Sequence, residues 1–453
     1  MPDRVPLRAT ASVGDALPVM RSTTAEPSAP ALAIIADDLT GAADVAGILR
    51  RAGVRVSLVA GDPASGSPVP ASDAVVIGLR IRTSPVAEAV ERAGAAADWL
   101  LAARPAVLAW KICSTFDSTP AGNIGPVTDA LLGRTGLPAA LVCPAFPENG
   151  RVVRDGRLFV HGVALDESPM RDHPLTPMRD ADLARLLAPQ VAEPGRVVRI
   201  DASRDAAGAI DAAIGAGARY LIPDAPDDAA AAALGEAVVG RALPVVASGL
   251  VPGVVAGLRR AGGLPASTEP PAVPRAAGPA LVVAGSCSAA TRGQVERFAA
   301  SYPVVRLQPW LADPATAAIG AARAALFGGA PAVLVASSAD PSGVAAVQRQ
   351  LGPGAGTLIE HWLGQVAAAL VEDGVRRLMV AGGETTGAVI DALGVRTFDV
   401  GGELAPGVPV LSADRAGRPL LLVAKSGNFG GPDLFAEALD ATSADAGEVA
   451  ADA

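Results

Sequence analysis

The chain has 453 residues, of which 50% are hydrophobic and 18% charged, with a net charge of −9 and a pI near 5.0. This length exceeds one ordinary core and indicates two domains, and the apolar, alanine-rich and glycine-rich composition is typical of an α/β protein. The acidic balance argues against a nucleic-acid partner, and the absence of an apolar run of roughly 18 to 20 residues argues against a membrane-spanning one. Any anionic substrate must therefore be attracted by a local site.

Both ends of the chain have the composition of disordered segments. Residues 1–30 are rich in Pro, Ser, Thr and Arg and lack the apolar core of a signal peptide, and residues 441–453 are similarly poor in large apolar side chains. The three cysteines, Cys113, Cys143 and Cys287, are too widely spaced for a zinc site or a disulfide framework. They are interpreted as small core residues in a reducing compartment, which predicts a cytoplasmic location.

From Ala31 onward apolar strands alternate with helices, as in parallel βαβ units. Strands are predicted at ALAIIA, VRVSLVA, DAVVIGL, AVLAWKI and PAALVCPA, and helices at about 42–52, 86–103 and 126–133. In such sheets ligands bind beyond the carboxyl ends of the strands. The chemically informative residues should therefore follow each apolar run.

The stretch AIIADDLTGAAD places two acids, Asp37 and Asp38, at the end of the first apolar strand. Neighbouring carboxylates repel each other and lose hydration when they are partly buried. A helix N-cap would explain one of the two acids but not both. We therefore predict a functional role for at least one of them.

Three further strands are followed by polar or charged loops. Arg80 and Arg82 come after DAVVIGL, and FPENGRVV follows the fifth strand. The strand AVLAWKI carries Lys111 and leads into CSTFDSTPAGN, which contributes Ser114, Asp117, Ser118 and Asn123. Four such loops at equivalent strand ends predict a site for a small polar anion.

Residues 151–180 interrupt this rhythm. RVVRDGRLFV predicts a hairpin around Asp155-Gly156, and His161 and His173 follow in a Pro-rich stretch. A metal site built on the two histidines is one interpretation. The favoured alternative is a loop that covers the site, and no protein metal site is predicted.

A Pro-rich segment, residues 261–279, predicts a linker between a first domain at 31–260 and a second at 280–440. The second domain has three small or glycine-rich turns after strands. They contain Ser286, then Gly382, Gly383, Glu384 and Thr385 before a helix starting near Gly387, and finally Gly427. Paired glycines allow a phosphate to approach the backbone closely, which favours nucleotide binding over a tight turn alone.

The motifs IADDLTGA, KICSTFDS, GSCS, AGGETTGAV, GELAPGVP and KSGNFG, in this order from about Ala33 to Asp433, resemble those of the four-carbon acid sugar kinase family. The resemblance implies two α/β domains, each a largely parallel sheet flanked by helices. The first would bind the acid sugar and the second ATP. The STFDS and KSGNFG forms are most similar to 3-oxo-tetronate 4-kinases, with D-threonate or D-erythronate 4-kinases as the alternative.

The resemblance also implies roles for individual residues. The ATP contacts are expected at Ser286, Gly382, Gly383, Glu384, Thr385 and Gly427, and the acid-sugar contacts at Asp37, Asp38, Arg80, Lys111, Ser114, Asp117 and Ser118. Many relatives have Arg-Gly-Asn after the DST element, whereas this chain has Ala-Gly-Asn ending at Asn123. Recognition of the substrate carboxylate would then fall to Arg80 or Arg82.

The expected reaction transfers the γ-phosphoryl group of ATP to a terminal hydroxyl, with Mg²⁺ bridging the phosphates. One acid of the doublet, with Asp38 favoured over Asp37, would take the hydroxyl proton. The non-kinase alternatives are a sugar-acid-binding protein and a dehydrogenase. A dehydrogenase is disfavoured because neither domain has a GxGxxG after its first strand with an acid about 20 residues on. The oligomeric state is left open, a homo-oligomer included.

Overall fold

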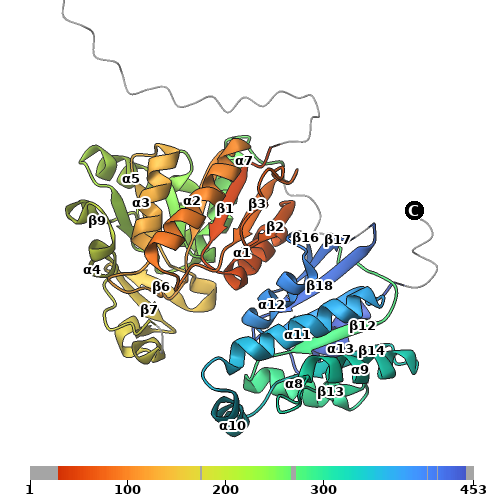
Figure 1. The fold of residues 1–453 in the computed structure, drawn as a ribbon. Helices are drawn as coiled ribbons and strands as arrows, with labels where there is room; N and C mark the ends of the chain where they lie inside the picture. The colour runs from red at the N-terminus through yellow and green to blue at the C-terminus, as the bar shows by residue number, and fades with distance from the viewer. Residues whose placement is uncertain (1–28, 174–175, 267–271, 406, 416, 445–453) are drawn as a thin grey trace, which may run out of the picture.

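The computed structural model describes residues 29–173, 176–266, 272–405, 407–415 and 417–444. The predicted N-terminal extension, apart from residues 29 and 30, and the predicted tail 441–453, apart from residues 441–444, lie outside the described residues. The tail prediction is wrong at its first residues, because Ala441 ends a helix and Thr442 is buried. Figure 1 shows two lobes, the first coloured from red to green and the second from green to blue. Both lobes consist of strands covered by helices, as an α/β composition predicts.

The first lobe is built on eight parallel strands in the order β2-β3-β1-β4-β11-β5-β10-β9. Their bounds are β1 Leu32–Ala36, β2 Val56–Ala60, β3 Ala74–Gly78, β4 Val107–Lys111, β5 Ala140–Cys143, β9 Val197–Ile200, β10 Tyr220–Pro223 and β11 Leu243–Val246. The helices are α1 Leu39–Arg51, α2 Val86–Ala102, α3 Ile124–Thr135, α4 Leu183–Leu187, α5 Ala206–Gly215, α6 Asp228–Val238 and α7 Val251–Arg260.

The second lobe has a parallel run, β13-β14-β12-β15-β18, extended by the antiparallel strands β17 and β16. The strands are β12 Ala280–Ala284, β13 Val304–Arg306, β14 Ala332–Ala336, β15 Arg377–Ala381, β16 Thr397–Ala405, β17 Val408–Asp414 and β18 Pro419–Lys425. The helices are α8 Ala289–Ala299, α9 Pro314–Phe327, α10 Pro341–Leu351, α11 Ala355–Glu372, α12 Gly383–Leu393 and α13 Leu434–Ala441.

The two lobes share one continuous sheet, which the strand-by-strand prediction did not include. Strand β16 pairs antiparallel with β2, so that fifteen strands form a single mixed sheet. The antiparallel pair β16–β17 was missed because its apolar residues are interrupted by the glycines and acids of DVGGELA. The lobes are therefore coupled through backbone hydrogen bonds, and the loops of both open toward the same side of the molecule.

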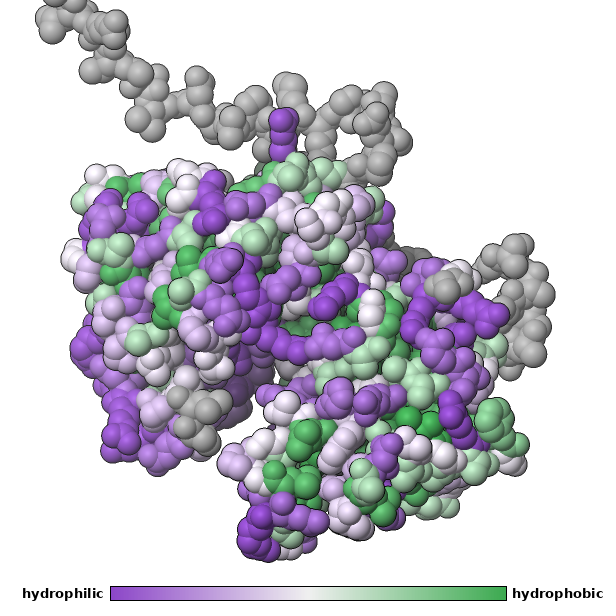
Figure 2. Space-filling model, viewed as in Figure 1, coloured by the Kyte–Doolittle hydropathy of each residue, from purple (hydrophilic) through white to green (hydrophobic). Residues whose placement is uncertain are grey.

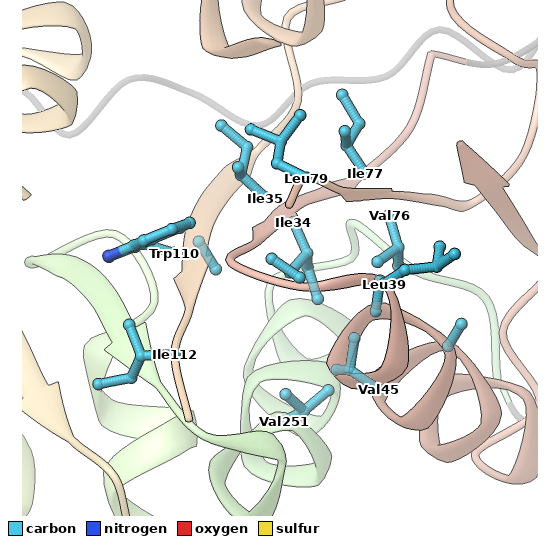
Figure 3. Close-up of a cluster of buried hydrophobic side chains, with 14 of the residues drawn as sticks. Ile34, Ile35, Leu39, Val45, Val76, Ile77, Leu79, Trp110, Ile112 and Val251 are labelled. Carbon is cyan, nitrogen blue, oxygen red and sulfur yellow. The ribbon is translucent and has the colours of Figure 1, made fainter. Parts of the chain in front are cut away.

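The core of the first lobe explains why its strands read as apolar runs. All five residues of β1 are buried, because helices cover both faces of the sheet. Figure 3 shows Ile34 on the face toward Val45 of α1 and Val251 of α7, while Ile35 lies on the opposite face near Ile77. Because both faces are buried, the run stays apolar until the chain leaves the sheet, and the polar residues follow at that point.

Two local predictions can be compared directly with the structure. The hairpin around Asp155-Gly156 is confirmed: β6 Arg151–Arg154 pairs antiparallel with β7 Arg157–Val160, and both turn residues have positive φ angles. A short strand, β8 Val163–Ala164, completes this three-stranded sheet. Helix α12 begins at Gly383, four residues before the predicted start at Gly387. The structure also bears on membrane insertion. Within the described ranges, no helix is both long enough and apolar enough to cross a membrane.

Candidate functional site

The polar loops that the sequence singled out in the first lobe meet at one edge of the sheet. Strand β1 lies between β3 and β4, with Ala36 in register with both Gly78 and Lys111. The loops that follow these three strands are therefore neighbours. They bring together Asp37 and Asp38 after β1, Arg80 and Arg82 after β3, and Asp117 after β4.

Arg82 connects the two acids of the doublet. Its Nε and Nη2 atoms each donate to one oxygen of Asp37 at 2.8 Å, in the bidentate geometry that arginine and carboxylate share. Nη2 also lies 3.0 Å from Asp38 Oδ1, and Nη1 lies 4.0 Å from Asp117 Oδ2. Asp37 is almost fully enclosed, whereas 28% of the Asp38 side chain is exposed. The two acids therefore have different environments.

Asp38 is both the N-cap of α1 and a wall of the cleft. Its Oδ1 accepts a hydrogen bond from the Gly41 backbone N–H at 2.8 Å, which is why the helix begins at Leu39 instead of Ala42. Burial raises the pKa of Asp38 and the charge of Asp37 raises it further, while Arg82 and Lys111 oppose both effects. A carboxyl group with a raised pKa that faces a cleft is a candidate for proton transfer.

The remaining predicted acid-sugar residues lie behind this surface. Asn123 is buried, and its Nδ2 donates to the carbonyl oxygens of Ile81 at 2.5 Å and Ser84 at 2.9 Å, so it holds the loop that carries Arg82. Ser118 is buried and donates to Gln190. Lys111 is 6% exposed at the end of β4. Neither these three residues nor Ser114 is among the residues that line the cleft.

Arg80 reaches across to the second lobe. Its Nη1 lies 2.9 Å from Asp391 Oδ2 on α12, and about half of each side chain is exposed. A Cβ atom at Gly387 would lie 2.4 Å from the Arg80 Nη2, so the guanidinium rests against the backbone of α12. In this conformation Arg80 therefore connects the two lobes, whereas Arg82 stays within the first.

The three glycine-rich or small turns of the second lobe follow β12, β15 and β18, which are adjacent in the sheet. The Gly427 carbonyl accepts hydrogen bonds from the hydroxyls of Ser288 at 2.6 Å and Thr291 at 2.8 Å. A Cβ atom at Gly427 would lie 2.4 Å from Ser286 Oγ, so glycine is needed for this close packing. The predicted nucleotide residues are thus brought together.

Lys425 lies buried beneath these turns. Its Nζ donates to Gln294 Oε1 at 2.5 Å, to Thr291 Oγ1 at 3.0 Å and to the Gly427 carbonyl at 3.1 Å. Burial lowers the pKa of Lys425 to about 8. The sequence placed Lys425 in a glycine-rich turn without assigning it a role. We interpret it as a residue that ties the turn after β18 to α8.

Helix α12 starts in the middle of the AGGETTGAV motif. Gly382 is its N-cap with φ +125°, a conformation that other residues rarely adopt, and Thr386 Oγ1 donates to its carbonyl at 2.8 Å. Gly383, Glu384 and Thr385 therefore form the first helical turn, whose N–H groups have no acceptor within the helix. A Cβ atom at Gly383 would lie 2.6 Å from Thr40 Oγ1, so the N-termini of α1 and α12 meet.

The two halves of the site face each other across a cleft of about 890 Å³. Figure 2 shows hydrophilic residues bordering the recess between the two lobes. Its lining includes Asp37, Asp38, Thr40, Arg80, Arg82 and Asp117 from the first lobe, and Gly383, Glu384, Asp391 and Ser426 from the second. The acid-rich loops and the glycine-rich helix start thus share one cavity.

Sequence reasoning missed one wall of this cleft. Thr357, Glu360, His361 and Gln365 of α11 line it, although α11 does not begin at a strand end. Burial raises the pKa of Glu360 to about 7, and the nearby Glu384 contributes in the same direction. A usable signal existed in the spacing, because polar residues three or four positions apart share a helix face.

The segment after the hairpin covers part of the cleft, as predicted. His173 and Thr176 are among the lining residues, and His173 Nδ1 accepts from the Thr176 backbone N–H at 3.1 Å. His161 is not part of this lining. In the part of the chain that the structure describes, no three His, Cys, Asp or Glu side chains come together as a metal site.

The prediction that all three cysteines are core residues is wrong for Cys287. Its side chain is exposed in the turn between β12 and α8, because the chain leaves the sheet there to form the N-cap of the helix. Cys143 is buried in β5, and burial raises its pKa to about 12. Cys113 Sγ lies 3.2 Å from Asp117 Oδ2 beside the acid-sugar loops.

Comparison with known proteins matches both lobes to family models. A sugar-binding N-terminal domain matches residues 32–254, and a nucleotide-binding C-terminal domain matches residues 281–435. A 3-oxo-tetronate kinase of Cupriavidus necator is 45% identical to this chain, and the match covers 90% of this chain and 96% of the relative. One from Methylobacterium radiotolerans is 46% identical, with 90% and 99% covered.

Solved structures agree over the same length. A Salmonella typhimurium LT2 protein superposes with a TM-score of 0.79 at 34% identity, covering 90% of this chain and 98% of the other. A Haemophilus influenzae protein gives a TM-score of 0.75 at 35% identity, with 90% and 99% covered. The predicted α/β fold and the predicted family are confirmed. The chain belongs to the four-carbon acid sugar kinase family.

Proposed function

We propose that the protein is an ATP-dependent kinase that phosphorylates the terminal C4 hydroxyl of 3-oxo-tetronate. The substrate assignment rests on relatives that are named 3-oxo-tetronate kinases and match about nine tenths of the chain at 45% and 46% identity. D-Threonate and D-erythronate remain the alternative substrates. A cytoplasmic location remains a prediction.

One observation carries the kinase assignment. The cleft places the Asp38 carboxylate on the same cavity as the first turn of α12, which contains Gly383 and Glu384. A helix N-terminus attracts phosphate groups through its free N–H groups and its dipole. A sugar-acid-binding protein has no need of this second half, and a dehydrogenase would need a cofactor fingerprint that the sequence lacks.

In the proposed reaction the C4 hydroxyl oxygen attacks the γ-phosphorus of ATP. The new O–P bond forms as the bond from the γ-phosphorus to the bridging oxygen breaks, and ADP leaves with that oxygen. The hydroxyl proton passes to Asp38, whose carboxylate lines the cleft and whose partner Arg82 keeps the loop in place. Most of the catalytic effect comes from positioning and from charge stabilisation.

The second lobe would hold the phosphates through backbone groups. The N–H groups of Gly383, Glu384 and Thr385 point out of the first turn of α12, and the turns containing Ser286 and Gly427 lie beside them. The meeting of the α1 and α12 N-termini near Thr40 places two positive helix ends at the point where the transferred group must pass.

Mg²⁺ fits this arrangement as an ion carried by the nucleotide. The nucleotide phosphates and water would supply most of its coordination. Glu384, in the first turn of α12 and on the cleft wall, is the carboxylate that could complete the shell. Bound there, the ion would neutralise the charge that develops on the phosphates.

A coupled ADP-release assay over a panel of four-carbon acids tests the proposal. We expect the highest kcat/KM with 3-oxo-tetronate and lower values with D-threonate and D-erythronate. ATP consumption with none of these acids would overturn the kinase assignment. A preference for threonate or erythronate would overturn the substrate alone.

Replacing Gly383 by Val should weaken nucleotide binding. A side chain there would project at the cleft wall from the helix turn that is proposed to hold the phosphates. We expect the KM for ATP to rise at least tenfold, equivalent to about 1.4 kcal/mol. The matched control is Gly320→Val, because Gly320 lies in α9 with open space around it. Equal ATP kinetics in the two folded variants would remove α12 from the nucleotide site.

Replacing Arg80 by Lys tests whether it binds substrate or connects the lobes. If Arg80 leaves Asp391 to bind the substrate carboxylate, Arg80→Lys should raise the KM for the acid about tenfold, because the bidentate fork is lost. Asp391→Asn is the matched control and should leave that KM unchanged or lower it. Equal increases in both variants would show that the ion pair itself is what binding requires.

A further inference from the structure

Lys111 is a buried cation without a hydrogen-bond acceptor. It is 6% exposed at the end of β4, and no described atom accepts a hydrogen bond from its Nζ or pairs with it within 4.0 Å. Burying an ammonium group without a partner is costly, so such a residue is rarely kept for stability alone. We therefore looked for a nearby anionic group that the positive charge of Lys111 stabilises.

The position of the Lys111 ammonium is fixed by the space above Gly41. A Cβ atom at Gly41 would lie 2.4 Å from Lys111 Nζ and 2.5 Å from Asp38 Oδ1. Both charged atoms therefore occupy the space that a side chain would take in the first turn of α1. They are close neighbours with no hydrogen bond between them.

Lys111 approaches Asp38 from inside the protein. Its side chain borders a small apolar cavity beneath β1, together with Ile34, Val251 and Val254. It is absent from the lining of the large cleft, whereas Asp38 is part of that lining. Of the two groups, Asp38 is therefore the one placed to contact a substrate in the cleft. This differs from the direct contact with the acid sugar that the family resemblance implied.

Four other charged groups lie around Asp38, and they show whether another cation already compensates its charge. They come from four elements: Asp37 at the end of β1, Arg82 in the loop after β3, Asp117 behind Arg82 in the loop after β4, and Glu384 on α12 across the cleft. Arg82 gives both oxygens of Asp37 a hydrogen bond, so much of its charge is compensated there. Lys111 is the cation without another acid partner.

We propose that Lys111 is a positioning residue that keeps the Asp38 carboxylate ionised and ready to accept the substrate proton. The inference rests on the proposed function, because it assumes that Asp38 is the proton acceptor. The ammonium acts through space and transfers no proton itself. Consistent with this geometry, Lys111 lowers the pKa of Asp38 against the effects of burial and Asp37.

The pH profile of kcat in Lys111→Met tests the proposal. Methionine fills a similar volume without charge, so the fold should persist in this apolar setting. Loss of the cation raises the pKa of Asp38, so a higher pH is needed to ionise it. We expect the acid limb of kcat to move up by about 1 to 2 pH units, with kcat approaching the wild-type value at high pH and the KM for the acid little changed.

Two further variants make the result decisive. In an Asp38→Asn background, Lys111→Met should cause no further loss of kcat, because it acts through the carboxylate that is already absent. Lys111→Gln should reproduce the shift of the acid limb. An unshifted acid limb, or a tenfold rise in the KM for the acid in both backgrounds, would overturn the proposal. So would failure of both Lys111 variants to fold, which would make the residue structural.

Failure of this inference can be told apart from failure of the proposed function. If Asp38→Asn loses activity but Lys111→Met keeps the wild-type pH profile, only the role of Lys111 is wrong. If Asp38→Asn turns over normally, the base assignment itself is wrong. If the wild-type protein releases no ADP with any acid in the panel, the kinase proposal is wrong.

Discussion

Replacing Asp38 by Asn should lower kcat by about 10² to 10⁴, with only a modest change in the KM for ATP. The amide preserves the shape of the carboxylate but loses its charge and most of its basicity. Asn can still accept the Gly41 N–H bond that caps α1, so the helix start should survive. Steady-state kinetics with both substrates varied, together with a thermal melt, measure the effect.

The matched control is the same change at the preceding residue. Both oxygens of Asp37 accept hydrogen bonds from Arg82, and the side chain is nearly inaccessible. The main effect of Asp37→Asn should therefore be a lower free energy of unfolding, with a smaller loss of kcat than in Asp38→Asn. The two variants carry the same Asp-to-Asn change at adjacent positions after β1, so they differ only in which carboxylate is lost. A larger loss of kcat in Asp37→Asn than in Asp38→Asn, in folded proteins, would reverse the assignment.

Local patterns in the sequence were enough to predict strands β1 to β5 of the first lobe and the positions of the loops that follow them. Each residue of β1, from Leu32 to Ala36, is buried on a two-sided sheet, so the run had to be apolar and the polar residues had to follow it. Parallel pairing with β3 and β4 then brings Asp38 next to Arg82 without further information. This part of the candidate site could be predicted because it depends on strand ends alone.

Contacts between distant elements could not be predicted in the same way. Nothing near Arg80 in the sequence indicates that it reaches Asp391. The spacing of the polar residues around Glu360 marks a polar face of α11, but it does not indicate that this face forms a wall of the cleft. Asn123 looked like a substrate residue because it ends a polar loop, yet its side chain faces the backbone of the loop after β3. These positions depend on how the lobes pack through β16 and β2, which no local periodicity encodes.

Replacing Arg82 by Met should be the most destabilising of the changes considered. It leaves the Asp37 carboxylate buried and without the cation that donates to both its oxygens. Removing one partner of a buried ion pair costs about 3 to 5 kcal/mol, and the quarter of the Arg82 side chain that solvent reaches reduces the expected loss to about 2 to 3 kcal/mol. Denaturant unfolding of the purified variant measures this loss.

A double-mutant cycle then separates the ion pair from the site. Asp37→Asn combined with Arg82→Met removes both charges, so the double variant should be more stable than Arg82→Met alone, with a coupling free energy of about 1 to 3 kcal/mol. Arg82→Lys keeps a cation but loses the fork, so it should fall between wild type and Arg82→Met. Activity need not return with stability, because Asp38 has also lost the Nη2 atom that lay 3.0 Å away. Additive effects of the two single changes would show that the Asp37–Arg82 pair does not stabilise the loop, and the distinction drawn between a structural Asp37 and a reactive Asp38 would then lose its physical basis.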